Sequence, residues 1–407
     1  MAEKIGVIGG GPAGIIAAGY AGARSKDVVL IEKNNKLGKK LYITGKGRCN
    51  ITNASPIEVF FDNIVSNKSF LYSSLYSFTN EDIVSLLNSY GLNTKIERGN
   101  RVFPLSDKSN DVIKALEKFL SDRNVNIMLN TCVVNIEYKD NKFIVEIDKN
   151  REIQFDKIIL ATGGISYPTT GSTGDGYKFA RNFGHKIQSL NPSLTGIEIE
   201  DGWIKDLQGL SLKNVELTSY VNKKEIYREF GEMLFTHYGI SGPIVLSTSS
   251  FINKYTKEEI EFHLDLKPAL SKEKLDKRIL RDFELYKNKQ INNGLIDLLP
   301  QKIIPIIINK SLIDEETFIH QITKSERNKL IDNIKALNFK FKALRPIREA
   351  IITSGGISVD EIESSTMESK LIPGLFFAGE IIDVDGLTGG YNLQIAYSTG
   401  YLAGINV

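Results

Sequence analysis

The first 32 residues constrain the fold more than any other part of the chain. They contain a short apolar segment (5–8), a glycine-rich turn, an alanine-rich segment (12–23) and a second apolar segment (28–31) that ends at Glu32. The turn carries glycines at positions 9, 11 and 14, which is the GxGxxG spacing. A strand, this turn, a helix and a second strand ending in an acid together predict a βαβ unit that binds a dinucleotide.

Each residue of this unit has a mechanical task. Gly9 allows the tight turn, Gly11 lets the backbone approach a pyrophosphate, and Gly14 lets the helix pack close to the strand. The N-terminus of the helix stabilises the phosphate charge, and Glu32 accepts hydrogen bonds from the adenosine ribose. The alternative is a glycine-rich turn in another kind of α/β unit. The cofactor-binding residues predicted here are Gly9, Gly11, Pro12, Ala13, Gly14, Glu32 and Lys33.

A second polar and glycine-rich segment, TGKGRCNITN, occupies positions 44–53 and shows no hydrophobic period of either kind. We expect its backbone around Gly47 and Asn50 to contact the cofactor, and Arg48 to pair with a phosphate. Cys49 is either a thiol activated by neighbouring cations or a small side chain packed near the cofactor. The whole segment is alternatively a plain surface loop. Lys40, just upstream, either approaches the cofactor phosphates or faces solvent.

Two later segments favour a flavin dinucleotide, FAD, over NAD. The segment KIILATGGISYP (157–168) predicts a strand that runs into small residues, and residues 371–404 predict a strand, a Gly-Glu turn and a final helix that opens after two glycines. The N-terminus of that helix can face the pyrimidine end of a flavin, where negative charge develops on reduction. We expect Glu380, rather than Asp383, to bind the ribityl hydroxyls. The cofactor-binding residues predicted here are Ala161, Thr162, Gly163, Gly164, Gly379, Glu380, Asp383, Gly390, Tyr391, Asn392, Leu393 and Ala396.

The set of motifs GGGPAG, TGKGRCNITN, YPTTGSTGDGY, LFTHYGISGP, TSGGI and GEIIDVDGLTGGYNLQ resembles the BaiN/YhiN-like FAD-dependent oxidoreductases. These belong to the two-dinucleotide-binding-domain flavoproteins and include proteins described as aminoacetone oxidases. The resemblance covers nearly the whole chain. It implies bound FAD and says little about the substrate. It also implies that Val133 offers its backbone amide to the adenine, although an ordinary strand valine is the alternative.

The pattern of apolar and polar residues changes along the chain, and this change predicts an interrupted domain. The fold class is α/β: a discontinuous Rossmann-like FAD-binding domain with an inserted antiparallel β-barrel-like domain that carries a small helical insertion. From about residue 191 short alternating runs indicate antiparallel strands, and from about 269 charged helical patterns follow. The predicted boundaries are 1–190 and 346–407 for the FAD-binding domain, 191–268 and 337–345 for the barrel, and 269–336 for the helical insert.

Four residues are candidates for catalysis. His237 lies in a glycine-rich turn and is either a proton donor or a histidine bonded within that turn. Arg345 and Arg348 either bind a carboxylate substrate or pair with acids such as Glu349. Cys49 is the fourth, although the sequence places no second cysteine near it. No spacing of a metal site occurs.

The composition of the chain argues against nucleic acid and membranes as partners. A net charge of +2 gives no electrostatic case for nucleic acid or anionic membrane. An apolar strand beginning by about Lys4 leaves no room for a signal peptide, and no apolar run approaches the ~20 residues of a membrane span. We expect a cytoplasmic enzyme with a small-molecule substrate, with no nucleic-acid or membrane partner; the oligomeric state is left open.

The predicted activity is that of an FAD-dependent oxidoreductase acting on a small organic substrate. Hydride would pass to or from the flavin N5 at the junction of the FAD and barrel domains. Without a second dinucleotide fingerprint, NAD(P)H would dock only transiently as a donor; the other option is an amine or amino-ketone oxidase. The alternatives are an RNA-modifying flavoprotein and a flavin-binding regulator without turnover.

Overall fold

The computed structural model describes residues 2–24, 26–148 and 151–407, and it divides the chain into two compact units. The first unit comprises Met1–Pro192 and Ile347–Val407, and the second comprises Ser193–Pro346. Met1, the first residue of the predicted FAD-binding domain, lies outside the described residues. Among the helices of the described ranges, none is both long enough and apolar enough to cross a bilayer.

The first unit is built on a five-stranded parallel sheet in the order β20-β11-β1-β2-β7. Four of its strands are short, apolar and largely buried, as expected where helices and loops cover both faces, whereas the edge strand β7 is more exposed. The bounds are β1 (Lys4–Ile8), β2 (Asp27–Ile31), β7 (Asn126–Met128), β11 (Lys157–Leu160) and β20 (Leu375–Phe377). The carboxyl ends of β1, β2 and β11 therefore open at one edge, where the glycine-rich turn lies.

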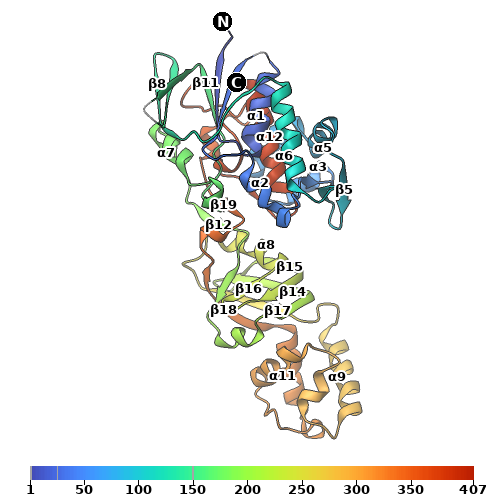
Figure 1. The fold of residues 1–407 in the computed structure, drawn as a ribbon. Coiled ribbons are helices and arrows are strands. Elements are labelled where there is room, and N and C mark those ends of the chain that lie inside the picture. The colour runs from blue at the N-terminus through green and yellow to red at the C-terminus, as the bar shows by residue number, and fades with distance from the viewer. Residues whose placement is uncertain (1, 25, 149–150) are drawn as a thin grey trace. The chain divides into compact units, whose positions relative to one another are not determined.

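Three helices of this unit lie side by side: α1 (Pro12–Gly22), α6 (Ser109–Asp122) and α12 (Tyr391–Asn406) (Figure 1). A Cβ atom added at Gly400 would lie 2.4 Å from the carbonyl oxygen of Ala13, and one at Gly404 would lie 2.5 Å from that of Ala17. The backbones of α12 and α1 therefore touch. This contact fixes the last helix of the chain against the first.

Smaller elements complete the first unit. A three-stranded sheet has the order β10-β9-β8, another has the order β3-β6-β5, and β4 pairs with β21. The strand bounds are β3 (Thr52–Asn53), β4 (Ile64–Ser66), β5 (Thr94–Glu97), β6 (Arg101–Pro104), β8 (Val133–Lys139), β9 (Lys142–Ile147), β10 (Arg151–Phe155), β19 (Ile352–Ser354) and β21 (Asp385–Gly386). The helix bounds are α2 (Lys39–Ile43), α3 (Ile57–Asp62), α4 (Tyr72–Ser77), α5 (Asn80–Ser89) and α7 (Asp175–Asn182).

The second unit contains a closed antiparallel barrel in the order β13-β16-β15-β14-β17-β18. The barrel strands are β13 (Ile197–Ile199), β14 (Ser211–Val221), β15 (Lys224–Phe235), β16 (Gly239–Ser241), β17 (Ile260–Asp265) and β18 (Leu337–Leu344). Side chains of β17 and β18 alternate between buried and more exposed positions, the period that the sequence indicated. The predicted α/β fold class, with its interrupted Rossmann-type domain and inserted barrel, is confirmed.

Four helices accompany the barrel: α8 (Pro243–Ile252), α9 (Lys272–Tyr286), α10 (Ile304–Lys310) and α11 (Lys324–Lys335). Buried residues of α9–α11 belong to the same hydrophobic core as the barrel strands. The backbone N–H of Leu266 donates to the carbonyl oxygen of Ile334 at 2.9 Å, which ties the end of β17 to α11. These helices and the barrel strands lie together in the second compact unit, Ser193–Pro346. The separate helical domain over 269–336 stays a prediction.

Candidate functional site

The three glycines of the first turn meet three different surroundings. Gly9 has a φ of +108°, and a Cβ atom there would lie 2.5 Å from the carbonyl oxygen of Ala161. A Cβ atom at Gly14 would lie 1.9 Å from the carbonyl oxygen of Gly9, whereas one at Gly11 would meet nothing within 4 Å. Gly9 and Gly14 are therefore needed for the turn and its packing, and the open space lies in front of Gly11.

The N-terminus of α1 borders this space. Gly11 is the N-cap residue of α1. No side chain caps this end of the helix, and the first turn of α1 contains no acidic residue. The N–H groups of the first turn are therefore unsatisfied by side chains, and they can bind an anion together with the positive end of the helix dipole. This arrangement fits a pyrophosphate.

Glu32 is buried at the end of β2, with 8% of its surface exposed. Its Oε2 accepts from the backbone N–H of Gly10 at 2.7 Å, and its Oε1 accepts from the backbone N–H and the side-chain amide of Asn34, both at 2.7 Å. Because a carboxylate has about four acceptor sites, it retains capacity for one more donor such as a hydroxyl. Lys33, in contrast, donates to Asp175 at 2.6 Å.

A half-buried cluster of polar groups, called the hub here, lies around Glu380. The ammonium of Lys40 donates to Oε2 and Oε1 of Glu380 at 2.7 and 2.9 Å, and to Ser166 Oγ at 2.6 Å. The hydroxyl of Ser166 and the backbone N–H of Thr353 also reach Oε1, at 3.1 and 2.9 Å. The hub joins α2, the loop after β11, β19 and the turn after β20, so the segments that the sequence singled out converge here.

The N-terminus of α12 meets the end of the TGKGRCNITN segment. Gly390 has a φ of +103°, and a Cβ atom there would lie 2.4 Å from the carbonyl carbon of Thr52. The amide of Asn53 donates to the carbonyl oxygen of Gly389 at 3.0 Å, and Asn392 donates to Gly386 at 2.7 Å. No side chain caps α12 at Gly390 and its first turn has no acid, so its N–H groups can also stabilise negative charge.

Cys49 is wholly buried, and burial raises the pKa of its thiol to about 12. It therefore remains a neutral thiol near neutral pH, which argues against the predicted catalytic role and favours the packed side chain. Two acceptors near these segments are buried with no hydrogen-bond partner in the described part of the chain: Asn50 Oδ1 and Thr162 Oγ1. Buried polar atoms without a partner are uncommon and point to a missing ligand or water.

Arg48, which was predicted to pair with a phosphate, is bonded to two carboxylates in this structure. Its Nε and Nη2 donate to Asp107 Oδ1 at 2.9 and 2.7 Å, and Nη2 also bonds Glu97. The guanidinium lies 4.2 Å from the ring centroid of Phe103. Two carboxylates and an aromatic face thus satisfy the group that the sequence assigned to a phosphate. Arg48 fastens the loop to the β5–β6 hairpin instead.

The other predicted residues divide between the two units. In the first unit, Asp383 accepts from the Asn67 amide at 3.0 Å, Val133 is buried in β8, and Arg348 is exposed. In the second unit, Arg345 donates to Glu198 at 2.7 Å and its guanidinium lies 4.7 Å from the centroid of Tyr238. His237 is exposed and packs edge-on against the same Tyr238 ring, with centroids 5.0 Å apart.

The last members of the predicted set are glycines, apolar side chains and one tyrosine. Gly379 lies close to α1, because a Cβ atom there would lie 2.7 Å from that of Ala13. For the rest of the predicted cofactor-binding residues, no hydrogen bond or ion pair is described above. They are Pro12, Gly47, Ala161, Gly163, Gly164, Tyr391, Leu393 and Ala396.

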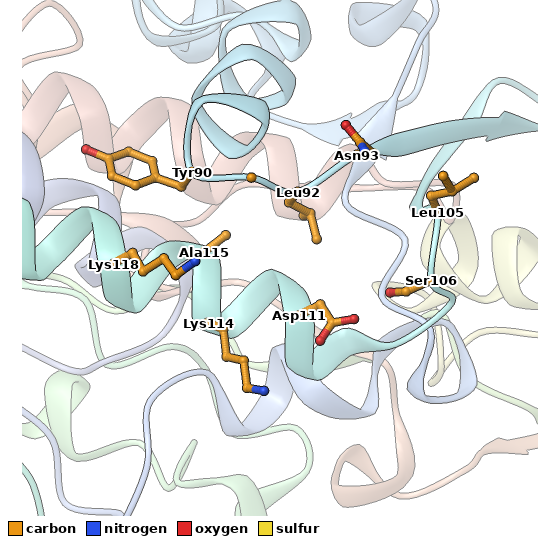
Figure 2. Close-up of a pocket in the computed structure, with 10 residues that line it drawn as sticks. Tyr90, Leu92, Asn93, Leu105, Ser106, Asp111, Lys114, Ala115 and Lys118 are labelled. Atoms are coloured by element: carbon orange, nitrogen blue, oxygen red, sulfur yellow. The ribbon is translucent and has the colours of Figure 1, made fainter.

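A hollow of about 440 Å³ lies elsewhere on the first unit, between the α5–β5 connection, the end of β6 and α6 (Figure 2). Figure 2 shows Lys114 and Lys118 projecting from α6 beside it. None of its lining residues belongs to the predicted cofactor site. We assign it no part in cofactor binding.

Comparison with known proteins identifies the family. The model of the HI0933-like protein Rossmann domain matches residues 3–406. The chain is 30% identical to the 3-dehydro-bile acid delta(4,6)-reductase of Clostridium scindens, over 99% of this chain and 98% of the relative. It is 29% identical to the ribosomal RNA dihydrouridine synthase of Haemophilus influenzae (98% and 97% covered) and 28% identical to that of Escherichia coli (97% and 95%). The chain belongs to the HI0933-like family.

Solved structures agree on the fold. The 3-ketosteroid-delta4-(5alpha)-dehydrogenase of Rhodococcus jostii superposes with a TM-score of 0.52 at 14% identity, covering 99% of this chain and 96% of that one. The 3-ketosteroid delta1-dehydrogenase of Sterolibacterium denitrificans gives a TM-score of 0.51 at 13% identity, with 99% of each chain covered.

These findings confirm the resemblance that the motifs indicated and the cofactor that they implied. The chain is a flavoprotein oxidoreductase that uses FAD. The local structure fits this cofactor, because the open cradle at Gly11, the uncapped N-termini of α1 and α12 and the unpartnered acceptors at Asn50 and Thr162 suit an elongated polar ligand.

Proposed function

We propose that this chain is an FAD-dependent reductase that saturates a carbon–carbon double bond conjugated to a carbonyl group. The observation that carries this proposal is that relatives with two different substrates match nearly the whole chain at almost equal identity. Their names describe the same kind of reaction, which removes a double bond from a bile acid in one case and from a uridine in the other. In both substrates the bond is conjugated to a carbonyl group.

The chain's own residues divide the work of holding the cofactor. The first turn of α1 would hold the pyrophosphate at Gly11, and Glu32 would accept from the adenosine ribose. Glu380, fixed by Lys40, would accept from the ribityl hydroxyls. The N–H groups at the start of α12 would stabilise negative charge at the pyrimidine end. When bound, FAD supplies the hydride chemistry.

We further propose that the substrate is a small enone and that NAD(P)H is the transient electron donor. A single glycine fingerprint supports the latter, because a second dinucleotide would have no built site of its own. Anaerobic stopped-flow spectroscopy tests both steps. NADPH or NADH should bleach the flavin band near roughly 450 nm, and a steroid enone or cyclohexenone should restore it. If reduced flavin is reoxidised by oxygen and by no enone or uracil-containing compound, the proposal fails.

The relatives named as ribosomal RNA dihydrouridine synthases favour a second candidate, in which the reduced double bond belongs to a uridine of ribosomal RNA. This candidate competes with the expectation that nucleic acid is no partner. Mass spectrometry of ribosomal RNA nucleosides tests it, in a strain without the gene and in the same strain complemented. Dihydrouridine that disappears and returns with the gene would establish the candidate, and an unchanged content would dismiss it.

A further inference from the structure

Three aromatic rings form a stack on the surface of the first unit: Phe61 at the end of α3, and Tyr72 and Tyr76 one turn apart on α4. The rings of Phe61 and Tyr72 are 4.3 Å apart and 21° from parallel, and those of Tyr72 and Tyr76 are 6.4 Å apart and 6° from parallel. Phe61 is buried, whereas Tyr72 and Tyr76 are 48% and 52% exposed. We call these three residues the tyrosine platform.

The tyrosine platform is joined to the rim of the cofactor site. Phe60, next to the platform, packs edge-on against Tyr391 at the start of α12, with centroids 5.0 Å apart. The strand β4, which follows α3, pairs with β21 immediately before the glycines of α12. Asn67, which directly follows β4, donates to the backbone oxygen of Asp383 at 2.6 Å. The platform therefore adjoins the end of the site where the pyrimidine part of the flavin is expected.

Exposed cations lie on the same rim. Arg98 and Arg101 flank the β5–β6 turn, and neither has a carboxylate within 4.0 Å among the described residues. The amide of Asn53 donates both to Gly99 in this turn, at 3.1 Å, and to Gly389 before α12, at 3.0 Å. The turn is thus held beside the start of α12. Its two exposed guanidinium groups have no carboxylate partner among the described residues, although Arg101 Nε donates to the backbone oxygen of Arg98 at 3.0 Å.

The same segment also joins the arginine turn to the platform. Asn100 donates to Ser55 Oγ at 3.0 Å, and Asn80, after α4, donates to the backbone oxygens of Asn53 and Ser55 at 2.8 and 3.1 Å. Residues 53–55 lead directly into α3. The platform and the arginines therefore belong to one locally braced surface. The exposed acids of α3, Glu58 and Asp62, disfavour phosphate contacts on that helix and leave them to the arginine turn.

We propose that this surface binds single-stranded RNA, with unpaired bases stacked on the tyrosine platform and phosphates contacted by Arg98 and Arg101. Parallel, exposed aromatic side chains bind bases without reading their sequence, and exposed arginines whose charge is not neutralised by a carboxylate complement a polyanion. A steroid offers no aromatic face for such a stack and no row of charges for the arginines. The proposal rests on the second candidate function and names the surface that would receive its RNA.

The test is binding of a fluorescently labelled single-stranded RNA of about 12 nucleotides to the full-length, FAD-loaded protein, followed by anisotropy at two salt concentrations. The double change Tyr72→Ala and Tyr76→Ala should weaken binding at least tenfold, because each stacked base contributes roughly five- to 150-fold. The matched change of both tyrosines to Phe keeps the rings and should stay within about twofold. Arg98→Gln and Arg101→Gln should each make the negative slope of log affinity against log salt shallower by about 0.7.

Tyr255→Ala serves as the control, because Tyr255 is 39% exposed and lies in the second unit; it should leave RNA affinity unchanged. Equal RNA affinity in the wild type and the double Ala variant, with the flavin spectrum retained in both, would overturn the proposal. A wild-type dimer that the double Ala change converts to monomer in sedimentation would also overturn it, because a second copy would then be the occupant.

The failure of RNA binding at this surface can be distinguished from the failure of the proposed reductase activity. RNA binding that depends on the platform, without any change in cellular dihydrouridine, would support the surface and count against the second candidate function. Reduction of an enone without measurable RNA binding would overturn the surface and leave the proposed reductase intact.

Discussion

At the residue scale, Cys49 is a buried thiol rather than a reactive one. Burial raises its pKa in the folded state to about 12, above the ~8.5 of an exposed thiol. A raised pKa of an acid means that the folded state keeps its proton while the unfolded chain loses it, so any stability from this group declines as pH rises above the unfolded pKa.

Cys49→Ser should therefore retain FAD and flavin reduction, and the rate should show no thiol ionisation between about pH 6 and 8. A hydroxyl in this buried site should lower the free energy of unfolding by about 1–2 kcal/mol. The flavin absorbance of the purified variant and its pH–rate profile check the prediction. A parent enzyme whose rate follows a single ionisation near neutrality, lost in Cys49→Ser, would restore the catalytic role.

We expect Glu32 to contribute more than Arg48 to the affinity for FAD. The sequence predicted that Arg48 pairs with a phosphate, but its guanidinium is bonded to Glu97 and Asp107, which lie 49 and 59 positions away. Glu32→Ala removes the acceptor that fixes Gly10 and Asn34. We expect the dissociation constant for FAD to rise roughly tenfold or more in Glu32→Ala and to change less in Arg48→Ala. Titration of apoprotein with FAD measures both, and the opposite ranking would return the phosphate to Arg48.

This contrast shows which site residues a sequence can predict. The tasks of Gly9, Gly11 and Gly14 follow from a turn of six residues, so their spacing alone specifies the geometry. The partners of Arg48 lie on a hairpin whose approach depends on tertiary packing, and no local pattern encodes them. The hub of Lys40 and Glu380, 340 positions apart, likewise could not be derived from either segment alone.

At the element scale, the contact between α1 and α12 couples the two ends of the chain. The sequence indicated both helices, but their backbone contact through Gly400 and Gly404 had no readable signal, because glycines inside a helical pattern are ambiguous. The contact matters for the proposed function, since α1 begins at the turn that we propose holds the pyrophosphate and α12 carries the second uncapped N-terminus.

Gly400→Ala tests this coupling. Alanine improves helix propensity by about 1 kcal/mol, but its Cβ would lie 2.4 Å from a backbone oxygen that cannot rotate away. Overpacking of this kind costs about 1–3 kcal/mol, so we expect net destabilisation and weaker FAD retention. Thermal unfolding and the flavin-to-protein absorbance ratio measure these effects. Gly202→Ala, where nothing lies within 4 Å of the added Cβ, is the control and should change neither; equal behaviour of the two variants would refute the coupling.

At the scale of the whole molecule, the sequence predicted the interruption of the Rossmann-type domain, because the change from mixed to alternating patterns is visible along the chain. It treated the charged helices of 269–336 as a domain of their own. Their polar residues dominate the pattern, while the few apolar ones, such as Leu330 and Ile334, complete the core of the barrel. Periodicity identifies an apolar face and leaves its partner unspecified.

The single tryptophan offers a direct test of this shared core. Trp203 packs edge-on against Phe339 of β18, with centroids 6.1 Å apart, and the ammonium of Lys310 on α10 lies 5.4 Å from its ring. Its fluorescence therefore reports on barrel and helices together. Ile334→Ala on α11 removes a fully buried side chain and should cost about 2–4 kcal/mol.

If barrel and helices unfold as one cooperative unit, Ile334→Ala must shift the urea midpoint of the Trp203 signal and of circular dichroism by equal amounts. Leu285→Ala on α9, where the side chain is 70% exposed, should leave both midpoints in place. Should the helices form an independent domain, the Trp203 transition would keep its midpoint while circular dichroism acquires a second, earlier phase. One shared transition would mean that the helical segment cannot be removed without losing the barrel, because the apolar residues of α11 would leave that core open.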